Sequence, residues 1–176
     1  MYVLPERLAM PANNVTRFLE SKKIAFTAFE LPAEKLGAVE TSRRLNVPIN
    51  QVFKTIVILR EKPGKPILAV IPGDSQANLK AIAALVNEKK VRLPTQREAE
   101  QLTGLQAGGI SPLALINKGF QVLVHSSAGM YEQIHISGGQ RGLNIRLPVM
   151  ALVELTHARL VEIATPLPEG ISENDE

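Results

Sequence analysis

Two short apolar runs separated by a turn constrain this chain most. The runs Val52–Arg60 and Ile67–Ile71 are rich in Val, Ile and Thr, as buried strands are. Between them lies Lys62-Pro63-Gly64-Lys65-Pro66, whose Pro and Gly residues favour a tight reversal. The pattern predicts a β-hairpin in the core. No apolar stretch approaches the ~20 residues that cross a bilayer, so we expect no transmembrane helix.

The remaining elements predict the fold class. Strands outnumber helices and cluster as hairpins, without the regular alternation of a doubly wound parallel sheet. We therefore expect an α+β single domain with a mixed β-sheet flanked by helices. Periodicity and capping residues predict helices over 14–23, 39–46, 78–88, 95–102 and 148–156. Further strands are expected over 24–31, near 91, and over 121–125, 133–136, 143–147 and 159–164. The strands over 121–125 and 133–136 are expected to form a pair joined through 126–129.

Length and composition exclude several classes of protein. A chain of 176 residues, 45% of them hydrophobic, suits one domain that needs no disulfide or metal to fold. It contains no cysteine, which excludes disulfides, thiolate zinc sites, iron–sulfur ligation and a cysteine nucleophile. Aromatic residues make up only 4%, so we expect no base-stacking platform of the single-strand-binding type.

Charge is unevenly distributed along the chain. The net charge is +3, but four of the 17 acidic residues lie beyond Pro168, so the rest, with 20 basic and 13 acidic residues, carries +7. Such a body suits a phosphate-bearing partner, and solubility alone explains it equally well. We expect an N-terminal extension over 1–11, a domain over 12–166 and an acidic disordered tail over 167–176. The first residues do not resemble a secretory signal, which favours the cytoplasm.

Lys54 is the first candidate for chemistry. It is a lone ammonium in a run otherwise built of Val, Phe, Thr and Ile, where a charge is unfavourable unless it reaches solvent or an anion. The alternative is that its long side chain extends to solvent from a strand edge, which basic side chains commonly do.

Two glycine-bearing segments are the next candidates. In Gly108-Gly109-Ile110-Ser111-Pro112, adjacent glycines can turn backbone N–H groups toward a phosphate or a developing oxyanion. In Ser137-Gly138-Gly139-Gln140-Arg141-Gly142, a guanidinium lies within a flexible turn, a grouping suited to anions. Ordinary tight turns, with Arg141 solvated, explain both segments as well.

Other ionisable residues give weaker signals. The three histidines show no metal-binding spacing, so we expect no metal and no cofactor. Asp74 follows a strand in Pro72-Gly73-Asp74, where it can act as an acid or orient an amine, although turn formation already explains an Asp there.

Four separated motifs resemble the YbaK family of aminoacyl-tRNA deacylases, which is related to the editing domain of bacterial prolyl-tRNA synthetases. The motifs are Val52-Phe53-Lys54-Thr55, Asn78-Leu79-Lys80, Leu102-Thr103-Gly104 followed by Gly108 to Leu113, and Ile136-Ser137-Gly138-Gly139-Gln140-Arg141-Gly142-Leu143. The match spans roughly 11–164. Ala114, where the family often has glycine, and Gln140, where lysine is common, depart from the pattern and leave the choice of amino acid open.

The resemblance implies a partly barrel-like α+β fold and a deacylase acting in trans on mischarged tRNA, most simply Cys-tRNA(Pro) or a related small amino acid on tRNA(Pro). It implies Lys54 as the catalytic residue, and prolyl-tRNA synthetase as a possible partner. The implied substrate-binding residues are Thr55, Asp74, Gly108, Gly109, Ile110, Ser111, Pro112, Ser137, Gly138, Gly139, Arg141 and Gly142.

The chemistry of an aminoacyl ester is consistent with this set of residues. The neighbouring ammonium activates the ester, so positioning and oxyanion donors matter more than a strong nucleophile. Water, or the thiol of a cysteinyl substrate as the resemblance implies, would attack, with donors near Gly108 and Gly109. Two alternatives are a non-catalytic module that binds tRNA or nucleotide, and an esterase indifferent to the tRNA.

Overall fold

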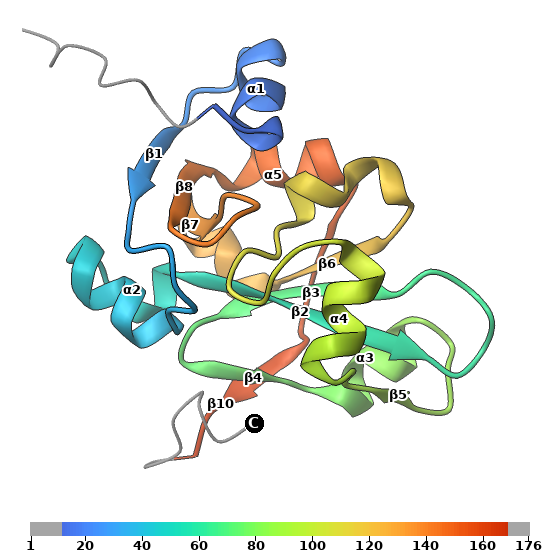
Figure 1. Ribbon diagram of the computed structural model, residues 1–176. Helices are drawn as coiled ribbons and strands as arrows, with labels where there is room; N and C mark the ends of the chain where they lie inside the picture. Colours follow the sequence, from blue (N-terminus) through green and yellow to red (C-terminus); the bar gives the residue numbers. More distant parts are fainter. Residues whose placement is uncertain (1–11, 169–176) are drawn as a thin grey trace, which may run out of the picture.

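The predicted hairpin forms the centre of the computed structural model, which describes residues 12–168 (Figure 1). Strands β2 (Phe53–Arg60) and β3 (Ile67–Pro72) pair antiparallel, from Phe53 opposite Pro72 to Ile58 opposite Ile67. Every residue of β3 is buried, as its continuous apolar sequence predicts. The expected extension over 1–11 and nearly all of the expected tail lie outside the described residues.

The hairpin belongs to a mixed five-stranded sheet in the order β5-β2-β3-β6-β9. Strands β6 and β9 are parallel to their neighbours, whereas β2 and β5 are antiparallel to theirs. A three-stranded antiparallel sheet, β1-β8-β7, and a two-stranded sheet, β10-β4, complete the strands. The other strands are β1 (Thr27–Glu30), β4 (Ser75–Ala77), β5 (Val91–Arg92), β6 (Gln121–His125), β7 (Gln133–Ser137), β8 (Leu143–Pro148), β9 (Arg159–Val161) and β10 (Ala164–Pro166).

Helices cover both faces of the five-stranded sheet. One core cluster joins Phe53 and Val57 of β2 to β7, β8, α5 and α1, and the other joins Ile58 and Ile71 to α3. Alternate residues of β2 therefore face different layers, as a strand's two-residue period requires. The α-helices are α1 (Asn14–Ser21), α2 (Ala38–Leu45), α3 (Leu79–Leu85), α4 (Gln96–Thr103) and α5 (Val149–Thr156); three short 3-10 helices are η1 (Ile49–Gln51), η2 (Pro112–Lys118) and η3 (Ser126–Met130).

A single bridge between Val52 and His135 connects the five-stranded sheet to β7. This contact brings the start of β2 beside the three-stranded sheet and partly closes the strands around the core. The predicted α+β class with a mixed sheet is confirmed. Among the described residues, no helix is long and apolar enough to span a membrane.

Two predictions about strands were wrong. The expected closing strand over 159–164 is interrupted at buried Ile163, whose N–H donates to His125 Nδ1 and whose carbonyl accepts from Asn78; the chain then continues as β10 beside β4. Strands β6 and β7 do not form the expected pair, because η3 separates them and each joins a different sheet.

Candidate functional site

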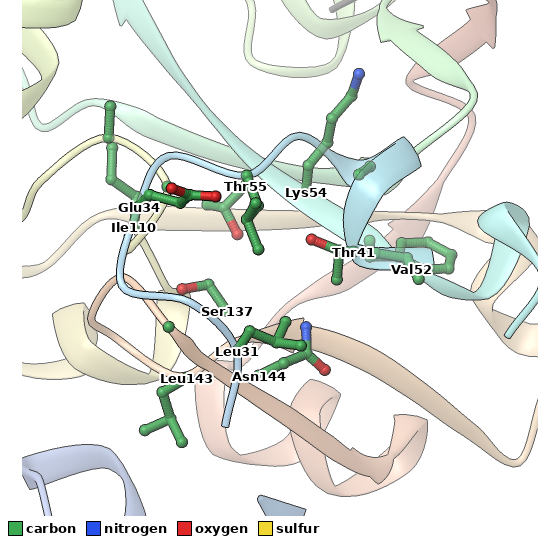
Figure 2. Close-up of a pocket in the computed structure, with 16 residues that line it drawn as sticks. Leu31, Glu34, Thr41, Val52, Lys54, Thr55, Ile110, Ser137, Leu143 and Asn144 are labelled. Atoms are coloured by element: carbon green, nitrogen blue, oxygen red, sulfur yellow. The ribbon is translucent and has the colours of Figure 1, made fainter. Parts of the chain in front are cut away.

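Four segments that are distant in sequence enclose one cavity of about 190 Å³ beside the start of β2 (Figure 2). They are the chain from the end of β1 into α2, the first residues of β2, the loop after α4, and the turn from β7 into β8. The lining residues are Leu31, Glu34, Leu36, Ala38, Thr41, Val52, Phe53, Lys54, Thr55, Ala107, Gly108, Ile110, Ser137, Gly142, Leu143 and Asn144. We call this cavity the main pocket.

Strand alternation sets the roles of Lys54 and Thr55. Phe53 and Val57 face the cluster that contains β7 and β8, so Thr55 between them faces the same side, toward the main pocket. Lys54 begins on the other side of β2, with Ile56, and borders the pocket at its edge. In Figure 2 its ammonium points away from Ser137 and Asn144.

The Thr55 hydroxyl has an unusual environment. Within the described residues its Oγ1 is fully buried and has no hydrogen-bond partner. A buried hydroxyl without a partner is unfavourable and therefore uncommon in folded proteins. Thr55 lines the main pocket, so a ligand that reached this oxygen would supply its missing hydrogen-bond partner.

The two glycine segments hold each other at the pocket wall. Gly108, which lines the pocket, has a φ of +88°, a conformation that glycine adopts most easily. At Gly109, a Cβ atom would lie 2.9 Å from backbone atoms of Gln140 and Arg141. Arg141 in turn donates from Nε to the Ala107 carbonyl at 2.6 Å. These contacts make the two turns one interlocked unit.

The structure brings six of the predicted site residues to the main pocket and leaves seven outside its lining. Lys54, Thr55, Gly108, Ile110, Ser137 and Gly142 line it. Gly109, Ser111, Pro112, Gly138, Gly139, Arg141 and Asp74 do not.

Several of the seven have local structural contacts. The Gly109 N–H, expected near an oxyanion, already donates to the Gln106 carbonyl at 2.8 Å. Buried Ser111 accepts from the Leu113 N–H, and Pro112 begins η2. Gly138 donates to the Leu143 carbonyl at 2.8 Å, so it closes the turn into β8. Asp74 is exposed in the turn between β3 and β4.

Sequence reasoning missed three polar residues of the pocket: Glu34, Thr41 and Asn144. Asn144 and its partner His135 are both buried, and Asn144 Oδ1 lies 2.9 Å from His135 Nδ1. Because the amide oxygen only accepts, Nδ1 is the donor and the Asn144 amino group is directed toward Thr41 (Figure 2). Burial lowers the pKa of His135, outweighing the hydrogen bond that it donates to Asn144, and Arg146 lowers it further. Asn144 directly follows the glycine turn, and its alternation with the apolar residues of β8 was the available signal.

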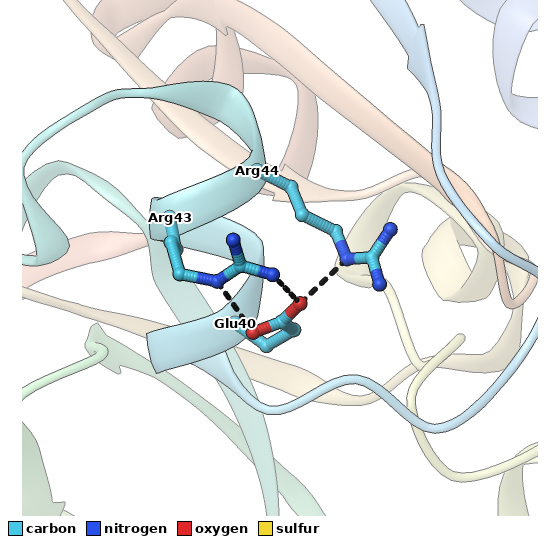
Figure 3. Close-up of polar contacts among 3 residues, drawn as sticks. All are labelled: Glu40, Arg43 and Arg44. Atoms are coloured by element: carbon cyan, nitrogen blue, oxygen red, sulfur yellow. Dashed lines mark hydrogen bonds and ion pairs between the residues drawn. The ribbon is translucent and has the colours of Figure 1, made fainter.

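Helix α2 presents two different faces to its surroundings. Ala38 and Thr41 face the pocket, and Glu40 binds Arg43 and Arg44 (Figure 3). Arg43 Nε lies 2.9 Å from Glu40 Oε2, and Arg44 Nε lies 2.7 Å from Oε1. The hydrogen bonds from Arg43 and Arg44 lower the pKa of Glu40 to about 2. These charges are thus paired locally on the helix.

The charged groups of the main pocket are few. Glu34 is the one carboxylate and Lys54 the one ammonium among its lining residues. Across residues 12–168, no group of three or more histidine, aspartate or glutamate side chains is arranged to hold a metal ion. The arrangement can therefore bind a ligand through an ammonium, a carboxylate, hydroxyls and backbone groups.

A family model described as the aminoacyl-tRNA editing domain matches residues 33–155 of the chain. This range contains every residue that lines the main pocket except Leu31.

Individual relatives extend the match over more of the chain. The chain is 32% identical over 154 residues to EbsC of Enterococcus faecalis, provisionally named a Cys-tRNA(Pro)/Cys-tRNA(Cys) deacylase; the match covers 86% of this chain and 93% of EbsC. A proline–tRNA ligase of Pediococcus pentosaceus is 31% identical over 74 residues, which cover 42% of this chain and 13% of the ligase. A crystal structure described provisionally as a trans-editing enzyme for prolyl-tRNA synthetase has a TM-score of 0.74 and 23% identity, over 88% of this chain and 99% of that one. At that identity the likeness concerns the fold.

Proposed function

Because the chain belongs to the family of aminoacyl-tRNA editing domains and is a trans-editing aminoacyl-tRNA deacylase, we propose that it removes cysteine from Cys-tRNA(Pro) in the main pocket. The name of EbsC, which aligns with most of this chain, supports this substrate. The observation that supports the pocket most directly is the buried, unpartnered Thr55 hydroxyl on its wall, beside Lys54.

The pocket suits a small aminoacyl group. A cavity of about 190 Å³ with apolar walls at Leu31, Leu36 and Ile110 has room for a side chain of cysteine size. The α-ammonium of the substrate needs a polar or anionic partner once it leaves water. Glu34, the one carboxylate in the lining, supplies that partner.

The reaction requires cleavage of one ester bond. In hydrolysis, water adds to the carbonyl carbon, the C–O bond to the terminal ribose breaks, and a proton from the water passes to the leaving ribose oxygen, which becomes a hydroxyl. Where cysteine is the aminoacyl group, its thiol sulfur can instead form the bond to carbon, with the thiol proton passing to the leaving ribose hydroxyl. Either path develops negative charge on the carbonyl oxygen, which nearby donors stabilise.

Three groups of this chain meet the requirement for donors. The Thr55 hydroxyl is buried at the pocket wall, the Asn144 amino group is directed toward the pocket, and Lys54 borders it. The role of Lys54 is to bind the ribose–phosphate side of the ester or to polarise the ester itself. The backbone of Gly108, which also lines the pocket, is a further contributor, whereas the Gly109 N–H is occupied by its turn.

The partner is the acceptor end of mischarged tRNA, and the match of part of this chain to a proline–tRNA ligase supports tRNA(Pro) as the carrier. Prolyl-tRNA synthetase is a second partner, supplying the selection of tRNA(Pro). The proposed location is the cytoplasm, where charged tRNA is used.

A panel of mischarged tRNAs, incubated with substoichiometric protein, tests this function. We expect multiple turnovers on Cys-tRNA(Pro) and slower cleavage of bulkier aminoacyl esters, with the synthetase added in a parallel series. Tight binding with the ester intact would instead identify a non-catalytic module. Equal cleavage of cysteine methyl ester and Cys-tRNA(Pro) would identify a general esterase.

A further inference from the structure

A second cavity, of about 180 Å³, lies on the other side of β2 from the main pocket. Lys54 lines both cavities, and Ile56, which shares its face of β2, lines only the second. The lining residues are Lys54, Ile56, Ile71, Gln76, Ala77, Leu79 and Leu93. We call it the α3-side cavity because Leu79 begins α3.

The α3-side cavity differs from the main pocket in chemistry. Five of its seven lining residues are aliphatic, and Gln76 is the uncharged polar one. Its lining contains no carboxylate, whereas the main pocket contains Glu34. An α-ammonium beside the Lys54 ammonium would be repelled there, so this cavity does not suit the aminoacyl group. It suits an uncharged, largely apolar group that can form a hydrogen bond with the Gln76 amide.

The two cavities meet at Lys54, the one residue that lines both. β5 pairs with β2 only at Leu59 and Arg60, so among the described strands none pairs with this edge of β2 from Phe53 to Ile58. Lys54 lies on this edge, between the cavities. A ligand bound at Lys54 therefore has the main pocket on one side of this residue and the α3-side cavity on the other.

An exposed leucine at the rim supports a ligand in the α3-side cavity. Leu93 is 41% exposed although it lines a concave, largely apolar surface. Apolar surface of this kind gains free energy when a ligand covers it.

We infer that the α3-side cavity binds the adenine base of the 3′-terminal adenosine of tRNA, with Lys54 at the ribose–phosphate junction and the aminoacyl group in the main pocket. This inference rests on the proposed function, since it assumes that the main pocket holds the aminoacyl end. Leu79 and Leu93 contact the faces of the base, and the Gln76 amide binds its edge.

Steady-state kinetics of Leu93→Ser on Cys-tRNA(Pro) test the inference. A serine removes the apolar contact without adding a charge that would repel tRNA, and we expect kcat/KM to fall about tenfold. Leu102→Ser is the matched control, because Leu102 is 40% exposed on α4 and lines neither cavity. Unchanged kcat/KM for Leu93→Ser, or an equal loss in both variants, would overturn the inference.

A fluorescence measurement follows the base directly and does not depend on turnover. The probe is an acceptor-stem minihelix that ends in 2-aminopurine and has an amide-linked cysteine. Binding to the wild-type protein should raise its fluorescence as the base leaves the stack on its neighbour, and Leu93→Ser should abolish the rise while Leu102→Ser keeps it. A rise that Leu93→Ser leaves intact contradicts the base site. If the wild-type protein deacylates no tRNA, the proposed function is wrong. The fluorescence result then tests the base site by itself.

Discussion

At the scale of residues, the site depends on neighbouring side chains of β2 that face opposite layers. Thr55 faces the main pocket and Lys54 faces the α3-side cavity, yet both border the place where the ester is expected. A strand is the element that separates consecutive side chains in this way. Two consecutive residues of β2 thus supply the site with a buried hydroxyl, from Thr55, and an ammonium, from Lys54.

Replacing Thr55 by valine separates stability from activity. The hydroxyl is buried without a partner, so Thr55→Val should raise the free energy of unfolding by about 1 kcal/mol. If Oγ1 binds substrate, kcat/KM should fall about tenfold at the same time. Urea unfolding and deacylation kinetics measure the two effects. Thr156→Val, which removes a hydroxyl bonded to the Leu152 carbonyl, should instead lose stability and keep activity. Loss of both stability and activity in Thr55→Val would refute the assignment.

His135 makes stability depend on pH. Its pKa in the folded protein is lowered from 6.5, chiefly by burial, so the unfolded chain takes up a proton at higher pH than the folded one does. Its contribution to stability is therefore complete above pH 6.5 and is lost as pH falls from 6.5 toward the folded pKa, by at most about 1.4 kcal/mol per pH unit.

Urea unfolding between pH 7.5 and 5.5 measures this effect. His135→Gln should flatten the slope, whereas His157→Asn, at an exposed left-handed helix end that asparagine tolerates, should keep it. Identical slopes in the wild type and His135→Gln would exclude His135 as the cause.

At the scale of elements, two turns that are distant in sequence act as one wall of the main pocket. The Gly108–Gly109 loop and the turn from β7 into β8 contact each other through close backbone approach at Gly109 and through the Arg141–Ala107 hydrogen bond. If the two turns came apart, both Gly108 and Ser137 would be displaced from the pocket wall.

Gly109→Ala tests this interlock. The added Cβ would lie 2.9 Å from the backbone of Gln140 and Arg141, so we expect a loss of about 1–3 kcal/mol in the free energy of unfolding and a fall in kcat/KM. Gly129→Ala is the matched control, because its Cβ would meet nothing closer than 3.8 Å. Chemical denaturation and deacylation assays compare the two variants. Equal stability in both would mean that the turns are not held together at Gly109.

The sequence predicts elements better than it predicts their partners. The alternating and apolar patterns located β2 and β3, and the helices predicted from 14 and from 95 begin where Asn13 and Thr95 cap α1 and α4. Sheet membership of β6 and β7 depends on long-range packing, which local pattern does not contain. The same limit hid the break at Ile163, where a contact with His125 stops the strand.

The site residues that could be predicted are those whose residue type is unusual within its own segment of the sequence. Glycines at 108 and 142 and the lysine at 54 stood out because each is unusual for its segment, and all three line the main pocket. Glu34 and Thr41 did not, since exposed acids and helical threonines are ordinary in a single sequence. That Lys54 lines two cavities could not be predicted, because the unpaired edge of β2 on which it lies is evident only once the sheet order is known.

At the scale of the whole molecule, the fold places β2 as a partition with a cavity on each side. The five-stranded sheet anchors its far end through β3 and β5, while Val52 ties its near end to the second sheet at His135. Among the described strands, none pairs with this edge of β2 between Phe53 and Ile58, where Lys54 lies. Deacylation in the main pocket requires that lysine to act on the ester rather than only extend to solvent.

Single-turnover deacylation of Cys-tRNA(Pro) by Lys54→Ala is the most direct measurement, with Lys89→Ala, which removes an exposed ammonium outside both cavities, as control. The account predicts a rate at least ~100-fold below wild type for Lys54→Ala, with a cooperative unfolding transition retained, and an unchanged rate for Lys89→Ala. A folded Lys54→Ala protein that cleaves the ester at the wild-type rate would contradict it.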